Sequence, residues 1–176
     1  MKKILLGLLS LAILLCSGCF KGEHKEIPPP YTADSGGVEV TVSHVVDGDT
    51  LIVRRGLDKV KVRLIGIDTP ESVHRDESKN TREGKIASER LARYLTGKTV
   101  RLEFDAESQD KYGRWLAYVY YNGSMVNAEL LKAGLAKALT IPPNTKHADE
   151  FAEIEAAARE SGAGFWGAES SLFLNS

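Results

Sequence analysis

Four short segments of the sequence carry side chains that could bind a cation or an anion. They are Asp-Gly-Asp-Thr at 47–50, an arginine at position 63, Asp-Thr-Pro-Glu at 68–71 and Asp-Lys-Tyr-Gly-Arg at 110–114. Each has a simpler explanation when taken alone, because Asp-Gly is common in hairpin turns and a Lys-Tyr-Gly-Arg stretch suits a solvated loop. Their combination favours a functional site.

Asp49 and Asp68 together suggest a cation site. If both lie at the same mouth of a barrel, two carboxylates and a backbone carbonyl form an all-oxygen site of the kind that Ca²⁺ or Mg²⁺ prefers. Glu71 follows three residues after Asp68, where it could take a proton from a water near the cation. Zinc is not favoured, because no histidines have zinc-ligand spacing: His44, His74 and His147 are scattered.

Arg63 and Arg114 suggest an anion site. Alternation along the expected strand 60–67 puts Arg63 on the same side as Ile65 and Ile67, where a guanidinium is costly unless it meets an anion. A salt bridge to a neighbouring acid would also satisfy it. Two guanidinium groups offer paired donors whose geometry matches a phosphate.

The elements that would position these residues follow from hydrophobic periodicity. The expected strands are 38–46, 50–53, 60–67, 100–104 and 116–121, with a two-residue turn at Asp47-Gly48. The expected helices are 82–95, 125–133 and 149–160. Five strands with a helix between the third and fourth predict a mainly β, α+β fold: a five-stranded OB-fold β-barrel with three helices.

The N-terminal segment predicts export. A positive start, an apolar run over 4–15 that is short for a bilayer span, and Cys-Ser-Gly-Cys at 16–19 resemble a bacterial lipoprotein signal. We expect 1–19 to be a signal peptide, Cys19 to carry lipid, 20–37 to be a flexible tether and 38–170 to form the domain. An ordinary signal peptide or an uncleaved anchor is the alternative. We expect the mature protein to be a monomer that is lipid-anchored to the cell envelope membrane or secreted.

Composition does not separate the function classes. The chain has 23 Lys and Arg against 24 Asp and Glu, so it lacks the strong positive charge that would indicate a nucleic-acid partner. Both cysteines lie in the signal segment, which excludes disulfides and thiol nucleophiles from the domain. The functional prediction therefore depends on the sites.

The motif order resembles the staphylococcal nuclease (thermonuclease) family, in its lipoprotein form. The matching segments are the four above, followed by Leu116-Ala117-Tyr118 and the stretch from Asn127 to Lys137. The resemblance implies that Ca²⁺ is bound by the carboxylates of Asp49 and Asp68 and the main-chain carbonyl of Thr69, with Asp47 just behind them. It implies that Arg63, Glu71 and Arg114 are catalytic, and that Lys111 and Tyr112 contact the substrate.

The implied activity is calcium-dependent, extracytoplasmic hydrolysis of phosphodiester bonds in DNA and RNA to 3′-phosphate products, favouring single-stranded or A/T-rich regions. The stretch 138–142 lacks the aromatic pair that the family places there, which removes base stacking from the expected pocket. Two alternatives remain. One is a non-catalytic OB-fold lipoprotein that binds nucleic acid or oligosaccharide. The other is a structural calcium site in an adhesion or scaffold lipoprotein, which leaves both arginines unexplained.

Overall fold

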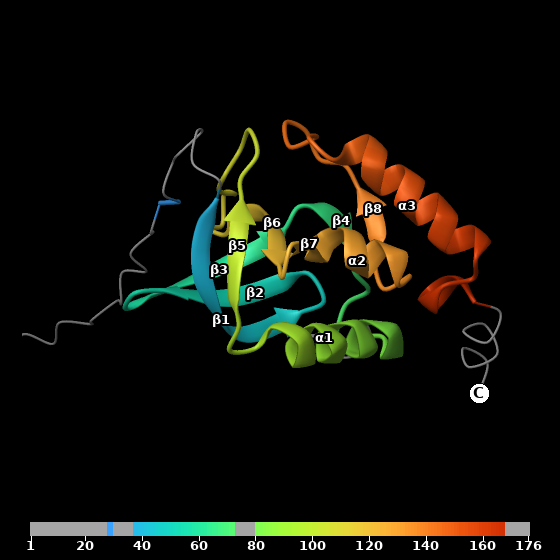
Figure 1. Cartoon of the computed structure of the whole chain (residues 1–176), viewed down its shortest axis with the longest axis horizontal. Helices are drawn as coiled ribbons and strands as arrows, with labels where there is room; N and C mark the ends of the chain where they lie inside the picture. The colour runs from blue at the N-terminus through green and yellow to red at the C-terminus, as the bar shows by residue number, and fades with distance from the viewer. Residues whose placement is uncertain (1–27, 30–36, 73–79, 168–176) are drawn as a thin grey trace, which may run out of the picture.

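Five strands close into a barrel in the computed structural model, which describes residues 28–29, 37–72 and 80–167 (Figure 1). The strands are β1 (Val38–Asp47), β2 (Thr50–Arg55), β3 (Asp58–Leu64), β5 (Thr99–Glu103) and β6 (Trp115–Tyr121). Antiparallel pairs run in the order β3-β2-β1-β5-β6, and a parallel pairing of β3 with β6 closes the ring. The predicted α+β barrel of OB type is confirmed.

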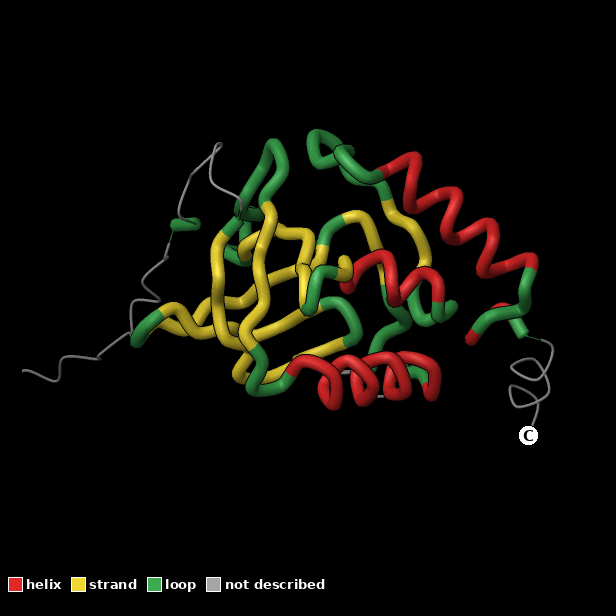
Figure 2. The backbone as a smooth tube through the Cα atoms, in the orientation of Figure 1, coloured by secondary structure: helices red, strands yellow, loops and turns green. Residues whose placement is uncertain are grey.

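Three helices accompany this barrel, as predicted, and lie below it and on one side of it (Figure 2). They are α1 (Arg82–Leu95), α2 (Val126–Lys132) and α3 (Ala148–Glu160), and a short 3₁₀ turn, η2 (Gly164–Trp166), follows. Helix α1 starts where the sequence predicts because the Thr81 hydroxyl accepts a hydrogen bond from the Gly84 N–H at 3.0 Å. Helix α2 starts one residue late, because β7 (Ser124–Met125) first pairs with β6.

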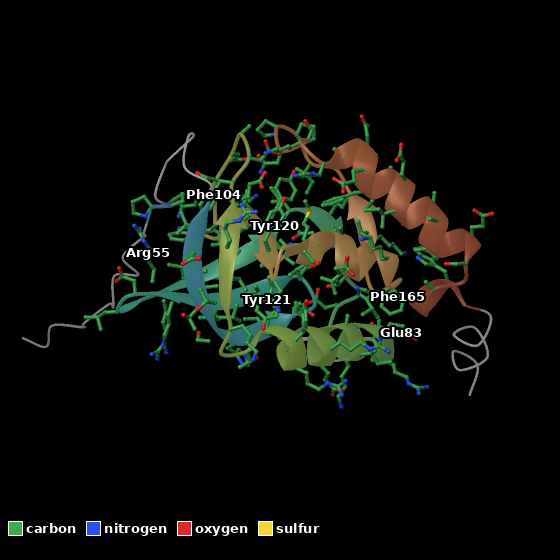
Figure 3. The ribbon with its side chains drawn as sticks, viewed as in Figure 1. Arg55, Glu83, Phe104, Tyr120, Tyr121 and Phe165 are labelled. Carbon is green, nitrogen blue, oxygen red and sulfur yellow. The ribbon has the colours of Figure 1, made fainter. Side chains whose placement is uncertain are left out.

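The core fills the barrel and extends under the helices. Alternate residues of each strand point inward, so that Val60, Val62 and Leu64 of β3 are buried while Lys59 and Lys61, which alternate with them, are exposed. Helix α1 covers one end of the barrel with buried side chains at Ala87, Leu91 and Leu95. At that end, Tyr94 of α1 packs edge-on against Tyr121 of β6, with ring centroids 5.1 Å apart (Figure 3).

The predicted strand 60–67 is wrong as a single strand. The chain turns at Ile65, and residues Gly66–Asp68 form a separate strand, β4, which pairs with β8 (Lys137–Leu139). Gly66 has a φ of 78°, and a Cβ there would lie 2.4 Å from a ring carbon of Phe151. The helix α3 residue Phe151 therefore packs directly on the backbone where the strand breaks.

The first hairpin turn is displaced by one residue from its predicted position. Asp47 pairs with Thr50, so the two turn residues are Gly48 and Asp49, not Asp47 and Gly48. Contacts with a distant segment favour this register, because the Asp49 carboxylate accepts hydrogen bonds from both Thr50 and Thr69. The shift places the carboxylate of Asp49 inside the turn, and Asp47 at the end of β1.

Several predictions fall outside the described residues. These are the signal peptide, lipidation at Cys19, most of the tether, the loop interior at 73–79 and the domain end beyond 167. In the described part of the chain, no helix has the length and apolar character needed to cross a membrane.

The buried amide of Asn127 joins α2 to the barrel and gives a test of this architecture. Its Oδ1 accepts from the Val119 N–H at 2.9 Å and its Nδ2 donates to the Ile65 carbonyl at 2.8 Å. Asn127→Ala leaves both backbone groups buried without a partner, so we expect a loss of about 2–4 kcal/mol in the free energy of unfolding. Urea denaturation measures this, with the exposed, same-helix Glu129→Ala as control. A loss below about 1 kcal/mol would contradict the assigned role.

Candidate active site

The carboxylate of Asp49 is the most deeply placed charged group of the candidate site. The residue is 7% exposed, although it lies in a hairpin turn. Its Oδ1 accepts from the Thr50 hydroxyl at 2.9 Å, and its Oδ2 accepts from the Thr69 N–H at 3.2 Å and the Thr69 hydroxyl at 3.1 Å. Burial raises the pKa of Asp49, and the neighbouring positive charge of Arg63 opposes that rise. The ionised form of Asp49 is therefore stabilised by a positive group beside it.

Arg63 links the two acids that the sequence analysis paired. Its NH1 lies 2.5 Å from Asp49 Oδ2, and its NH2 lies 3.2 Å from Asp68 Oδ1. NH1 also donates to the Leu64 carbonyl at 3.3 Å. The salt bridge considered above as the simpler explanation for Arg63 is thus present. The same bridge shows that Asp49, from the first turn, and Asp68, from β4, point to one place.

The oxygen atoms around Arg63 fit a hard divalent cation. Asp49 and Asp68 both contact the guanidinium of Arg63. Thr69, which is 7% exposed, packs on Asp49 and adds a main-chain carbonyl next to Asp68 in the chain. Asp47 lies behind them, where its Oδ1 accepts from the Gly48 N–H at 2.8 Å and the Ser72 hydroxyl at 2.5 Å. Within the described ranges, no three His, Cys, Asp or Glu side chains gather as a metal cluster.

Glu71 follows β4 on an exposed segment whose backbone is held by the start of α1. Its carbonyl accepts from the Thr81 N–H at 2.8 Å. A Cβ on Gly84, in the first turn of α1, would lie 2.4 Å from the carbonyl oxygens of both Pro70 and Glu71. Gly84 therefore allows the helix to approach the segment that carries Glu71. Sequence reasoning missed this role, because a glycine inside a helix gives no local sign of what packs on it.

Arg114 is oriented by an acid four residues earlier. Asp110 Oδ2 accepts from Arg114 Nε at 2.7 Å, and Asp110 Oδ1 accepts from the backbone N–H groups of Tyr112 and Arg114 at 2.9 and 3.0 Å. Burial alone would raise the pKa of Asp110, but these hydrogen bonds hold it below its ordinary value. Asp110 thus stays ionised and fixes the turn. The motif contains this residue, although sequence reasoning gave it no role.

A pocket of about 580 Å³ brings together four of the predicted residues. These residues are Arg63, Lys111, Tyr112 and Arg114, and the polar lining also includes Glu107, Asp110 and Asn144. Tyr112 is 72% exposed, with Lys111 Nζ 5.1 Å and Arg114 Cζ 5.7 Å from its ring centroid. Asp49, Asp68, Thr69 and Glu71 do not line this pocket, so Arg63 is the residue common to the acidic group and the cationic pocket.

Part of the pocket lining is aliphatic, and a pair of hydrogen bonds between distant residues holds the loops next to it. Leu139 and Ile141 line it, 37% and 62% exposed, in the stretch that lacks aromatic residues. Asn144 accepts from the Glu107 N–H at 2.8 Å and donates to the Glu107 carbonyl at 2.8 Å, which ties the loop before Asp110 to the loop after Ile141. These two residues are 37 positions apart, so no local pattern could have indicated their pairing.

The chain is similar in sequence to known nucleases. A protein-family model described as "Staphylococcal nuclease homologue" matches residues 61–168. A "Thermonuclease" of Staphylococcus intermedius is 39% identical over 167 residues, covering 94% of this chain and 99% of that protein. A "Thermonuclease" of Staphylococcus hyicus is 36% identical over 168 residues, with the same coverage. An "Endonuclease YncB" of Bacillus subtilis is 40% identical over 131 residues, covering 73% of this chain and 62% of that protein.

The contact of Gly84 with the segment 70–71 gives a structural prediction. Gly84→Ala places a real Cβ against two carbonyl oxygens at 2.4 Å, so the backbone at Glu71 must move away from the helix. We expect the hydrogen bond from the Thr81 N–H to Glu71 to weaken and its amide hydrogen exchange to speed up about tenfold or more, as measured by NMR. The exposed neighbour Lys85→Ala is the control. Unchanged exchange at Thr81 would show that Gly84 does not position Glu71.

Proposed function

Because the chain belongs to the staphylococcal nuclease family and is a nuclease, we propose that it hydrolyses phosphodiester bonds of DNA and RNA in a calcium-dependent reaction that leaves 3′-phosphate ends. The observation that supports this most is the placement of Arg63. Its guanidinium contacts both Asp49 and Asp68 and also lines the pocket that contains Arg114. Arg63 therefore connects the acidic pair, which could hold a cation, to a pocket that contains three cationic side chains and is large enough for a nucleotide.

The residues that would hold Ca²⁺ are Asp49, Asp68 and the carbonyl of Thr69. When bound, the ion supplies positive charge for a phosphate oxygen and lowers the pKa of a coordinated water. Asp47 would keep the first turn in place through its hydrogen bonds to Gly48 and Ser72. This assignment uses only oxygen donors, as calcium requires.

The chain's own side chains would carry out the remaining steps. Glu71, on the exposed segment that follows Asp68, would accept the proton of the attacking water. Arg63 and Arg114 would donate hydrogen bonds to the phosphoryl oxygens as negative charge builds on them. Lys111 and Tyr112, at the pocket mouth, would contact the phosphate and sugar of the bound nucleotide.

Substrate form and cellular location are further parts of the proposal. An open pocket beside an exposed Tyr112 suits a flexible strand, which supports a preference for single-stranded or A/T-rich nucleic acid. Leu139 and Ile141 offer an aliphatic surface to the base, which discriminates weakly between bases. The signal-like N-terminus supports export as a monomer, with lipid on Cys19 holding the enzyme at the cell envelope membrane.

Calcium removal separates the proposed nuclease from a non-catalytic binder. The protein should degrade heat-denatured DNA and RNA when Ca²⁺ is present and should stop when a chelator is added, as followed by acid-soluble nucleotide release. Glu71→Gln should lose orders of magnitude in rate while its thermal unfolding stays unchanged. Retardation of DNA in a gel without degradation would instead support the binding protein, and wild-type turnover by Glu71→Gln would remove that residue from the mechanism.

The contacts of Arg63 predict a competition between this arginine and the metal. Its guanidinium contacts both acids, so a divalent ion must displace it from them. Arg63→Met should therefore bind Ca²⁺ about tenfold or more tightly in isothermal titration calorimetry, even as hydrolysis falls. Arg114→Met is the matched control, because Arg114 pairs with Asp110 instead and should leave calcium affinity unchanged. Equal affinities for wild type and Arg63→Met would show that no displacement occurs.

A further inference from the structure

The outer face of β3 carries a row of basic side chains that ends in the candidate active site. Lys59, Lys61 and Arg63 alternate with Val60 and Val62, which are buried in the barrel. The first two cations are exposed, and Arg63 lies at the pocket. Since alternate strand residues are about 7 Å apart, the row extends over about 13 Å.

The neighbouring strand extends this surface sideways. In the β2–β3 pairing, Arg54 lies opposite Lys59, Ile52 opposite Lys61 and Thr50 opposite Arg63. Arg54 therefore faces the same side as the row and is exposed. We refer to Arg54, Lys59 and Lys61 as the hairpin cations.

Within the described part of the chain, the hairpin cations form no ion pair with an acidic side chain. The segment 50–63 contains one acid, Asp58, and its cross-strand neighbour is Arg55 at the hairpin tip. Figures 1 and 3 show this hairpin, with Arg55 labelled, reaching away from the helices on the side opposite α3. The resulting surface is positive although the whole chain has a net charge of −1.

We propose that the hairpin cations bind the phosphate backbone of a nucleic-acid strand beyond the bond that is cleaved, which extends the proposed nuclease site along β3. The surface is continuous with the pocket, because Arg63 pairs with Leu116 of β6 and both line it together with Lys111 and Arg114. The pocket itself holds Lys111 beside these two arginines, and the hairpin cations continue the positive charge from Arg63 along β3. This inference rests on the proposed function, since it assumes a polymeric substrate.

An anionic membrane is the competing partner for the same hairpin. Leu57 at the tip is fully exposed, and exposed apolar residues beside cations occur on membrane-binding surfaces. One leucine offers little apolar area, however, and the cations form a line toward Arg63 rather than a ring around Leu57. The arrangement therefore favours a strand of phosphates.

Binding can be measured without cleavage in a Glu71→Gln background of the full chain. The test variant adds Arg54→Ala, Lys59→Ala and Lys61→Ala. Its matched control adds Arg93→Ala, Lys85→Ala and Lys98→Ala, which removes one arginine and two lysines that are equally exposed on and after α1. Fluorescence anisotropy with a labelled single-stranded oligonucleotide of about 20 nucleotides gives the affinity at several salt concentrations.

The test variant should bind about tenfold more weakly than the control at about 0.1 M salt. The slope of log affinity against log salt concentration should be less steep by about 2 for the test variant, because three contacts with single-strand phosphates are lost. In the active protein, the same three substitutions should raise KM more for the long oligonucleotide than for a dinucleotide, which does not reach the hairpin. Circular dichroism confirms that both triple variants are folded.

Two outcomes would overturn the proposal. Equal salt slopes and equal affinities for the test and control variants would show that the hairpin has no special part in binding. Loss of binding to vesicles containing phosphatidylserine, with oligonucleotide affinity unchanged, would assign the hairpin to a membrane. Failure of the wild-type protein to cleave any nucleic acid would contradict the proposed function alone, because the anisotropy comparison does not depend on cleavage.

Discussion

A buried carboxylate needs a positive charge beside it, and Asp49 imposes this requirement on one end of the barrel. Its side chain is largely shielded from water, so Arg63 must lie within ion-pair distance to keep it charged. The same guanidinium reaches Asp68 and thereby holds the start of the Glu71 segment. The placement of Asp68 beside Asp49, and of the segment that leads from Asp68 to Glu71, follows from this one interaction.

Barrel closure brings the second half of the site to this point. The parallel pairing of β3 with β6 sets Arg63 opposite Leu116, just after the turn that carries Arg114. Asp110 orients that arginine, and Asn144 ties the preceding loop to the aliphatic part of the pocket lining. The groups that we propose to act together on a phosphate are therefore held by hydrogen bonds from separate loops, which would pre-organise them and limit the entropy lost on binding.

The strand β3 serves two purposes through its two faces. Its inward residues fill the core, and its outward residues carry cations from the hairpin tip to Arg63. A net charge of −1 conceals this arrangement, because β2 and β3 contain one acid, Asp58, and the other acidic residues lie outside these two strands. For the proposed nuclease, a line of cations leading to the pocket would increase the time that a long nucleic-acid strand spends near it.

The barrel, its three helices and the residue types of the site could be predicted from the amino-acid sequence, because alternation, helical spacing and short motifs are local properties. The break at Ile65-Gly66, the turn at Gly48-Asp49 and the pairing of Glu107 with Asn144 could not. Each depends on a partner far along the chain: Phe151 packing on Gly66, Thr69 binding Asp49, and Asn144 binding Glu107. The charge partners of Arg63 could not be predicted either. The sequence offers several nearby acids, and folding brings two of them, Asp49 and Asp68, within reach of the guanidinium.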